Sequence, residues 1–78
     1  MDLTTKQAEC LTAIRDITKA QGYPPNMPEL GAYLNVTPST AQLHVGNLRK
    51  KGYITEGGNG KHRTARLTDK ARALFREG

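Results

Sequence analysis

The stretch of sequence that decides the fold is residues 26–54, NMPELGAYLNVTPSTAQLHVGNLRKKGYI. Asn26 and Glu29 form a cap-like pair, because an Asn side chain at a helix start accepts a hydrogen bond from a first-turn amide. Thr37 followed by Pro38 marks a second helix start, with a capping hydroxyl and a proline at the first helical position. Asn35 lies between them and tolerates the left-handed conformation in which helices often end. We therefore expect two helices joined by a connection of only a few residues.

The second of these helices has an inner and an outer face. Ala41, Val45 and Leu48 are spaced by four and three residues, which places them on one side of a helix. Turning that side toward the core leaves Gln42 and Asn47 on the shoulders. The residues that then point outward are Ser39, Leu43, Gly46 and Lys50. A short helix, a tight turn and a longer helix predict a helix-turn-helix over about residues 26–51, with its recognition helix at 38–51.

After Gly52 the spacing of apolar residues changes from one typical of a helix to one typical of a strand. Residues 53–56 and 63–67 are short extended runs, and the glycine-rich segment 57–60 between them is typical of a hairpin turn. A basic hairpin directly after the helix pair predicts a winged helix-turn-helix, with the wing over about residues 53–67. A third short strand near Tyr23 and Pro24 is an alternative, so the wing has two or three strands.

Further helices flank this centre. Thr4 and Gln7 have the spacing of a capping box, Gly22 is a good helix stop, and a last helix follows from Thr68. The expected fold class is mainly α (α+β): three helices, a two- or three-stranded wing and a short C-terminal helix, in a single domain over residues 1–78. The expected core residues are Leu11, Ile14, Leu30, Leu34, Val45, Leu48 and Ile54.

Length and composition exclude several classes of protein. A chain of 78 residues leaves little room for an enclosed active site, and its single cysteine, Cys10, permits no internal disulfide and no multi-cysteine zinc site. His44 and His62 have no carboxylate or cysteine at metal-ligand spacing. We therefore expect no enzyme activity, no metal and no cofactor. No apolar run approaches the roughly 20 residues of a membrane span and no signal peptide is visible, so we expect a cytoplasmic protein with no membrane partner.

The distribution of charge points to a polyanionic partner. The chain carries 12 Lys and Arg against 7 Asp and Glu, a net charge of +5. Residues 1–36 hold three bases and four acids, whereas residues 37–78 hold nine bases and three acids. A basic surface confined to one half of a small domain favours nucleic acid as the partner.

Several segments resemble the N-terminal DNA-binding domain of LexA repressors. The resemblance covers about residues 3–67 and rests on Leu3-Thr4-x-x-Gln7, Pro24-Pro25-Asn26-x-x-Glu29-Leu30, Thr37-Pro38-Ser39 and Leu48-Arg49-Lys50-Lys51-Gly52-Tyr53-Ile54. The last segment, Arg66-Leu67-Thr68-Asp69-Lys70-Ala71-x-x-Leu74, is similar to the post-wing region of MarR-type regulators. The resemblance implies a double-stranded DNA-binding transcriptional regulator or repressor of prokaryotic or phage origin. The 78 residues do not include the LexA peptidase and dimerisation domain, and residues 39–44 differ from the common LexA pattern.

Candidate DNA contacts divide into base-reading and phosphate-binding groups. Gln42 suits an adenine edge, Ser39 and Thr40 suit bases or a phosphate, and Leu43 suits a thymine methyl group. Lys50 and the basic tip of the wing suit phosphates or a minor groove. The full set of expected DNA-binding residues is Thr37, Ser39, Thr40, Gln42, Leu43, Asn47, Lys50, Lys61, His62 and Arg63.

Other partners remain as alternatives. Leu43 and the basic face also suit a protein-interaction winged helix that binds an acidic partner. Single-stranded nucleic acid is less favoured, since the chain has three Tyr, one Phe and no Trp to stack on bases. We expect a monomer in solution that forms a weak homodimer on DNA, because one recognition helix contacts only a few base pairs.

Overall fold

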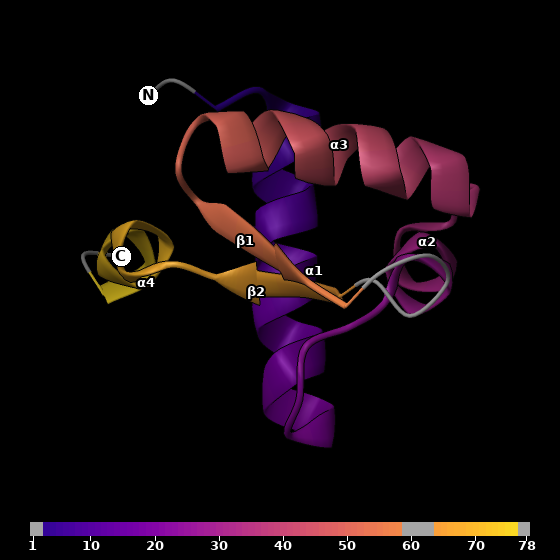
Figure 1. Ribbon diagram of the computed structural model, residues 1–78, viewed down its shortest axis with the longest axis horizontal. Helices are drawn as coiled ribbons and strands as arrows, with labels where there is room; N and C mark the ends of the chain where they lie inside the picture. Colours follow the sequence, from indigo (N-terminus) through magenta and orange to yellow (C-terminus); the bar gives the residue numbers. More distant parts are fainter. Residues whose placement is uncertain (1–2, 59–63, 77–78) are drawn as a thin grey trace.

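The computed structural model describes residues 3–58 and 64–76. Four helices and a two-stranded sheet follow one another along the chain (Figure 1). They are α1 (Thr5–Gln21), α2 (Met27–Leu34), α3 (Pro38–Lys50), β1 (Ile54–Gly57), β2 (Thr64–Leu67) and α4 (Asp69–Arg76). This order confirms the predicted winged helix-turn-helix. The predicted wing-tip residues Lys61, His62 and Arg63 lie outside the described residues.

The helices begin and end where the local chemistry predicts. Thr4 accepts a hydrogen bond from the Gln7 amide at 3.1 Å, and the Gln7 side chain accepts one from the Thr4 amide at 3.2 Å. Asn26 and Glu29 form the same reciprocal pair at the start of α2, at 2.8 and 3.0 Å. Asn35 ends α2 with a φ of 61°, the left-handed conformation expected of it. The starts of both helices are therefore set by pairs of residues three positions apart in the sequence.

The turn between α2 and α3 requires a glycine at residue 31. The Val36 amide donates to the Gly31 carbonyl at 2.9 Å, which folds the chain back tightly after α2. A Cβ atom on Gly31 would lie 2.8 Å from the Val36 carbonyl oxygen and 3.3 Å from the Pro38 nitrogen. Gly31 costs some helix propensity, but the close approach of the backbone leaves no room for a side chain.

The wing is a two-stranded antiparallel sheet in which Ile54 pairs with Leu67 and Gly57 pairs with Thr64. The alternative of a third strand near Tyr23 and Pro24 is wrong. The chain instead meets β2 slightly later, through an isolated bridge between Asn26 and Thr64 and a 3.0 Å bond from the Ala65 amide to the Pro25 carbonyl. Prolines have no amide hydrogen, so residues 24 and 25 offer only acceptors and cannot continue a ladder.

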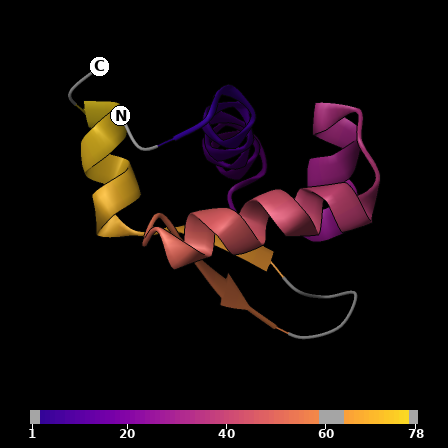
Figure 2. The same ribbon diagram turned by 90° about the horizontal axis from the view of Figure 1, so that it is seen from above.

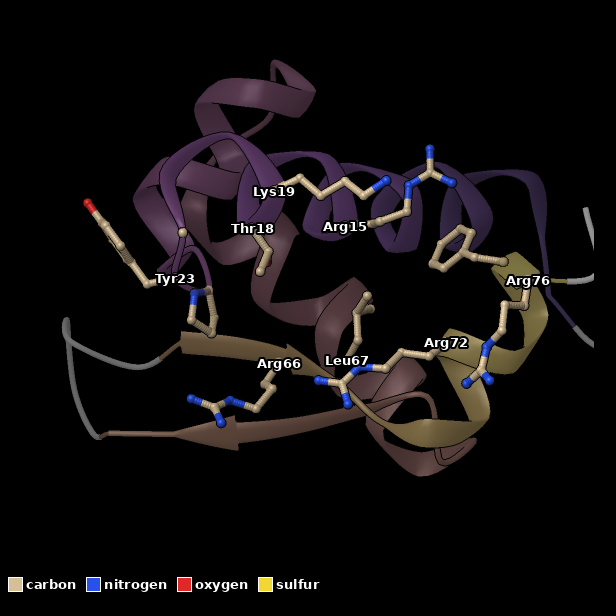
Figure 3. Close-up of a pocket in the computed structure, with 11 residues that line it drawn as sticks. Arg15, Thr18, Lys19, Tyr23, Arg66, Leu67, Arg72 and Arg76 are labelled. Atoms are coloured by element: carbon tan, nitrogen blue, oxygen red, sulfur yellow. The ribbon is translucent and has the colours of Figure 1, made fainter.

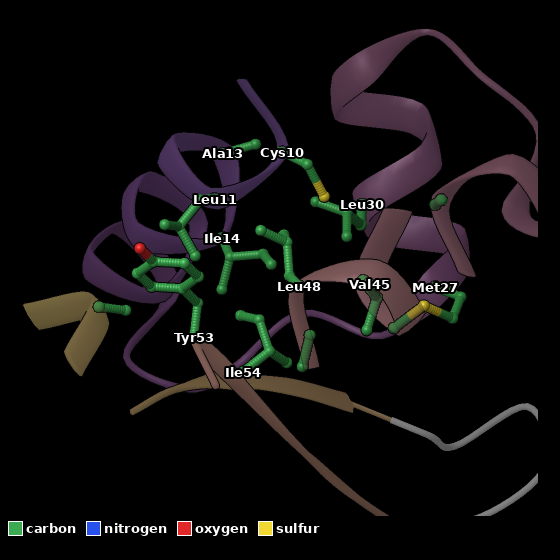
Figure 4. Packing of buried hydrophobic residues seen from close by; sticks show 13 residues of the cluster. Cys10, Leu11, Ala13, Ile14, Met27, Leu30, Val45, Leu48, Tyr53 and Ile54 are labelled. Atoms are coloured by element: carbon green, nitrogen blue, oxygen red, sulfur yellow. The ribbon is translucent and has the colours of Figure 1, made fainter. Parts of the chain in front are cut away.

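The core lies where α1, α2, α3 and the start of the wing meet (Figure 4). Six of the seven predicted core residues are buried: Leu11, Ile14, Leu30, Val45, Leu48 and Ile54. Leu34 is only partly buried and packs against the edge of the core, because it occupies the last turn of the short helix α2. Cys10 is fully buried, and desolvation raises the pKa of its thiol from 9.0 to about 12, which disfavours the reactive thiolate form.

Helix α3 lies along one edge of the molecule, with α1 behind it and the wing beside it (Figure 2). Helices α2 and α4 lie near its opposite ends, and none of the helices and strands that the structure describes covers the outer side of α3. Over the described residues no helix combines the length and apolar character needed to cross a membrane.

Candidate nucleic-acid interface

The outer face of α3 carries the side chains predicted to meet DNA. Ser39, Leu43 and Lys50 are exposed, while Gln42 and Asn47 are half-buried on the shoulders of the helix. Leu43 is 63% exposed, the highest value among the large apolar side chains of the described residues. Ala41, Val45 and Leu48 are fully buried on the opposite side. The helical wheel drawn from the sequence is therefore correct for this helix.

Two threonines at the start of α3 bond to each other. The Thr37 hydroxyl accepts from the Thr40 amide at 3.2 Å and donates to the Thr40 hydroxyl at 3.0 Å. The Thr37 side chain thus caps the helix. Thr37 is exposed and Thr40 is half-buried, so both hydroxyls lie at the start of α3, where the sequence predicts contact with DNA.

A carboxylate from the wing reaches the shoulder of α3. Glu56 lies in β1, and its Oε1 accepts a long hydrogen bond of 3.4 Å from Nε2 of Gln42. The same oxygen lies 4.0 Å from Nε of Arg49, in the last turn of α3. The Glu56 side chain is only 11% exposed, so its charge needs such partners. Gln42 is thus held between the helix and the wing.

Sequence reasoning missed Glu56, although one signal was present. Side chains alternate in a strand, so Glu56 lies on the same face of β1 as the buried Ile54. That alternation already directs it inward toward α3. Its contact with Gln42 spans fourteen positions and depends on how α3 and the wing pack together.

Lys51 has a structural role in addition to its charge. Its Nζ donates to Oε1 of Gln7 at 2.7 Å, and Gln7 is only 8% exposed. This bond ties the end of α3 to the first turn of α1. Arg49 and Lys50, in contrast, are exposed and remain the cations that α3 offers to a polyanion.

The described part of the wing ends at one pair of residues. Gly57 and Thr64 form the last pair of the ladder, and the predicted DNA-binding residues Lys61, His62 and Arg63 fall between them in sequence, outside the described residues. Gly58, the residue directly after β1, has a φ of 71°, a conformation that favours glycine.

An exposed recognition helix beside a two-stranded wing defines a winged-helix protein of the DNA-binding class. The sequence profile of the LexA DNA binding domain matches residues 1–64. The chain belongs to the LexA DNA-binding domain family, which confirms the resemblance seen in its sequence.

Similar proteins agree with this assignment. The chain is 46% identical over 67 residues to a LexA repressor of Thermotoga neapolitana, covering 86% of this chain and 34% of that protein. It is 41% identical over 71 residues to a LexA repressor of Thermotoga maritima, covering 91% of this chain and 36% of that protein. The chain therefore spans about a third of the length of these relatives.

A solved structure shares the fold. It is a MarR-like transcriptional regulator from Thermotoga maritima, with a TM-score of 0.76 and 23% sequence identity, over 97% of this chain and 52% of that chain. At this level of identity the likeness concerns the fold alone.

Proposed function

We propose that the chain binds double-stranded DNA in a sequence-specific way and acts as a transcriptional regulator of the repressor type. The observation that carries the proposal is the outer face of α3, where Ser39, Gln42 and the 63% exposed Leu43 share a surface backed by a fully buried inner face. A helix of this kind fits the major groove, which presents a distinct pattern for each base pair. Such a protein acts in the cytoplasm, on the chromosome.

The two ends of α3 take different parts of the duplex. Its first turns present Ser39, Thr40, Gln42 and Leu43 to base edges. Lys50 lies in the last turn, where it meets a phosphate, and Asn47 lies between the two regions. Lys61, His62 and Arg63 of the wing tip are assigned to phosphates or the adjacent minor groove. Phosphate contacts position the protein, whereas base contacts select the sequence.

Two copies on adjacent half-sites are part of the proposal. A single recognition helix contacts few base pairs, so specificity grows when two copies bind half-sites about one helical turn apart. In this proposal the free protein is a monomer, and two copies form a weak homodimer only when they are bound to DNA. Sedimentation with and without a two-site duplex tests this, and a stable dimer without DNA contradicts it.

The alternative of an acidic protein partner is less well supported. Leu43 and the basic residues of α3 are the features that suggested it, and a thymine methyl group and phosphates account for the same features. Membership of a DNA-binding domain family also favours DNA.

The test is selection of bound sequences from a random duplex library, followed by binding to the selected and the scrambled duplex. We expect an enriched motif, and tighter binding to the selected duplex by a factor of about 1,000 or more. Equal affinity for both duplexes would show that the chain binds DNA without reading it. No binding to either duplex would contradict the proposal altogether.

A further inference from the structure

The two faces of the wing carry different charges. Thr55 and Arg66 are paired across the ladder and both are exposed, and Figure 3 shows the Arg66 side chain pointing away from α1. Glu56 and Ala65 form the next pair, and side chains alternate along a strand, so this pair lies on the opposite face. Ala65 is fully buried there, and the Glu56 side chain is only 11% exposed. The wing thus turns a carboxylate toward α3 and an arginine outward.

The Glu56 carboxylate determines how the Gln42 amide is turned. A primary amide accepts hydrogen bonds through its oxygen and donates through its NH2 group, whereas a carboxylate only accepts. Nε2 of Gln42 donates to Oε1 of Glu56 at 3.4 Å, so the NH2 group faces the wing. Turning the amide over would bring two oxygen atoms together. With one N–H proton on Glu56, the amide oxygen and the second N–H proton are the pair that Gln42 can offer to a base.

The two purines differ in how they match this pair. In the major groove adenine presents an acceptor, N7, beside a donor, the N6 amino group, whereas guanine presents two acceptors, N7 and O6. One donor and one acceptor on Gln42 therefore satisfy adenine in both bonds. Guanine requires two donors, which Gln42 provides only if its NH2 group leaves Glu56. Taking a donor from a nearly buried carboxylate costs free energy, so the wing disfavours guanine.

We propose that Glu56 is a specificity-determining residue, which makes Gln42 select adenine and reject guanine at one position of the DNA site. The inference rests on the proposed function, because it requires α3 to lie in the major groove. Glu56 acts through Gln42 and is a positioning residue. Nε of Arg49 lies 4.0 Å from the same Glu56 oxygen and adds a weak attraction that keeps the carboxylate near α3.

The test compares two duplexes that differ at one base pair. The position that Gln42 reads is the one at which Gln42→Ala loses the preference of the selected sequence. Duplexes with adenine or guanine at that position are bound to the wild-type, Glu56→Gln and Glu56→Met chains, and fluorescence anisotropy gives each affinity. We expect the wild-type chain to prefer adenine by about tenfold or more.

The two variants should reduce this preference in order. Glu56→Gln leaves a carboxamide that both accepts and donates, so the preference should fall to about threefold. Glu56→Met has a similar length and offers no acceptor oxygen, so adenine and guanine should bind about equally. The control is Glu9→Gln, the same substitution at an exposed position of α1, and it should leave the preference unchanged.

A second measurement needs no DNA. The Gln42 side-chain NH2 group gives its own pair of NMR signals in the isotope-labelled chain. Glu56→Met removes the acceptor and should shift these signals, whereas Glu9→Gln should not. Helical circular dichroism checks that each variant is folded, and if Glu56→Met is not, Glu56→Gln alone decides both measurements.

The outcomes separate this inference from the proposed function. A selected sequence with no Gln42-dependent position, or with a base other than adenine there, would overturn the role of Glu56 and leave DNA reading by the chain intact. An unchanged adenine preference in the Glu56 variants, or unchanged Gln42 NH2 signals, would do the same. The absence of any enriched sequence would contradict the proposed function, and this inference with it.

Discussion

The two halves of α3 differ in composition although they belong to one rigid helix. The first half offers Ser39, Gln42 and Leu43, which carry no charge, and the second half offers Arg49 and Lys50, which are exposed cations. Uncharged groups distinguish base pairs, whereas cations bind every phosphate alike. The difference teaches that selectivity and affinity are separated along a single helix. Substitutions in the two halves should therefore have different signatures.

The largest expected effect comes from a residue on the buried face of α3. Leu48 is fully buried there, so Leu48→Ala should lower the free energy of unfolding by about 2–5 kcal/mol. That is a large fraction of the stability of a small domain. The control is Leu43→Ala, the same substitution on the exposed side of the same helix, with an expected change within about 0.5 kcal/mol. Urea unfolding measures both, and equal losses would contradict the assigned faces.

The next largest effect is a loss of affinity for the selected duplex that the scrambled duplex does not show. Gln42→Ala should cost about 1–3 kcal/mol on the selected sequence and nearly nothing on scrambled DNA, because it removes a base contact. Gln21→Ala, at the end of α1, is the matched control and should change neither affinity. An equal loss on both duplexes, or no loss on either, would show that the first half of α3 does not read bases.

A cation in the second half should act on all duplexes alike. Lys50→Ala removes one phosphate contact, so the slope of log affinity against log salt should become shallower by about 1. Lys61→Ala and Arg63→Ala in the wing tip should behave in the same way. Lys19→Ala, on the side of the molecule away from α3, is the control and should leave the slope unchanged. If Lys50→Ala instead alters only the selected duplex, the division of α3 into two halves is wrong.

The smallest effect concerns the link between the helix and the wing. Glu56→Gln keeps the shape of the side chain and removes its negative charge from beside Gln42 and Arg49. Binding to scrambled DNA should strengthen by less than about 1 kcal/mol, because the Glu56 carboxylate no longer repels the DNA phosphates. The preference for the selected duplex should fall, because the Gln42 amide is held less firmly. Asp69→Asn on α4 is the control, and an unchanged preference would show that Glu56 does not position Gln42.

Local chemistry explains why so much of the fold was predictable. The caps at Thr4, Asn26 and Thr37 involve partners three residues away, so the sequence alone predicts them. The inner face of α3 follows from helical spacing in the same way. The long-range contacts were not predictable, because Glu56 meets Gln42 and Lys51 meets Gln7 only after the elements have packed. The base and phosphate assignments stay predictions until DNA binding is measured.

The bond between Lys51 and Gln7 has a consequence for the order of folding. It joins residues 44 positions apart, whereas the turn between α2 and α3 is closed by Val36 and Gly31, five positions apart. Closing a long loop costs more chain entropy than closing a short one, so contacts of low sequence separation tend to form first. We therefore expect α2 and α3 to meet before α1 docks across them. Lys51→Met should then speed unfolding and leave the refolding rate almost unchanged.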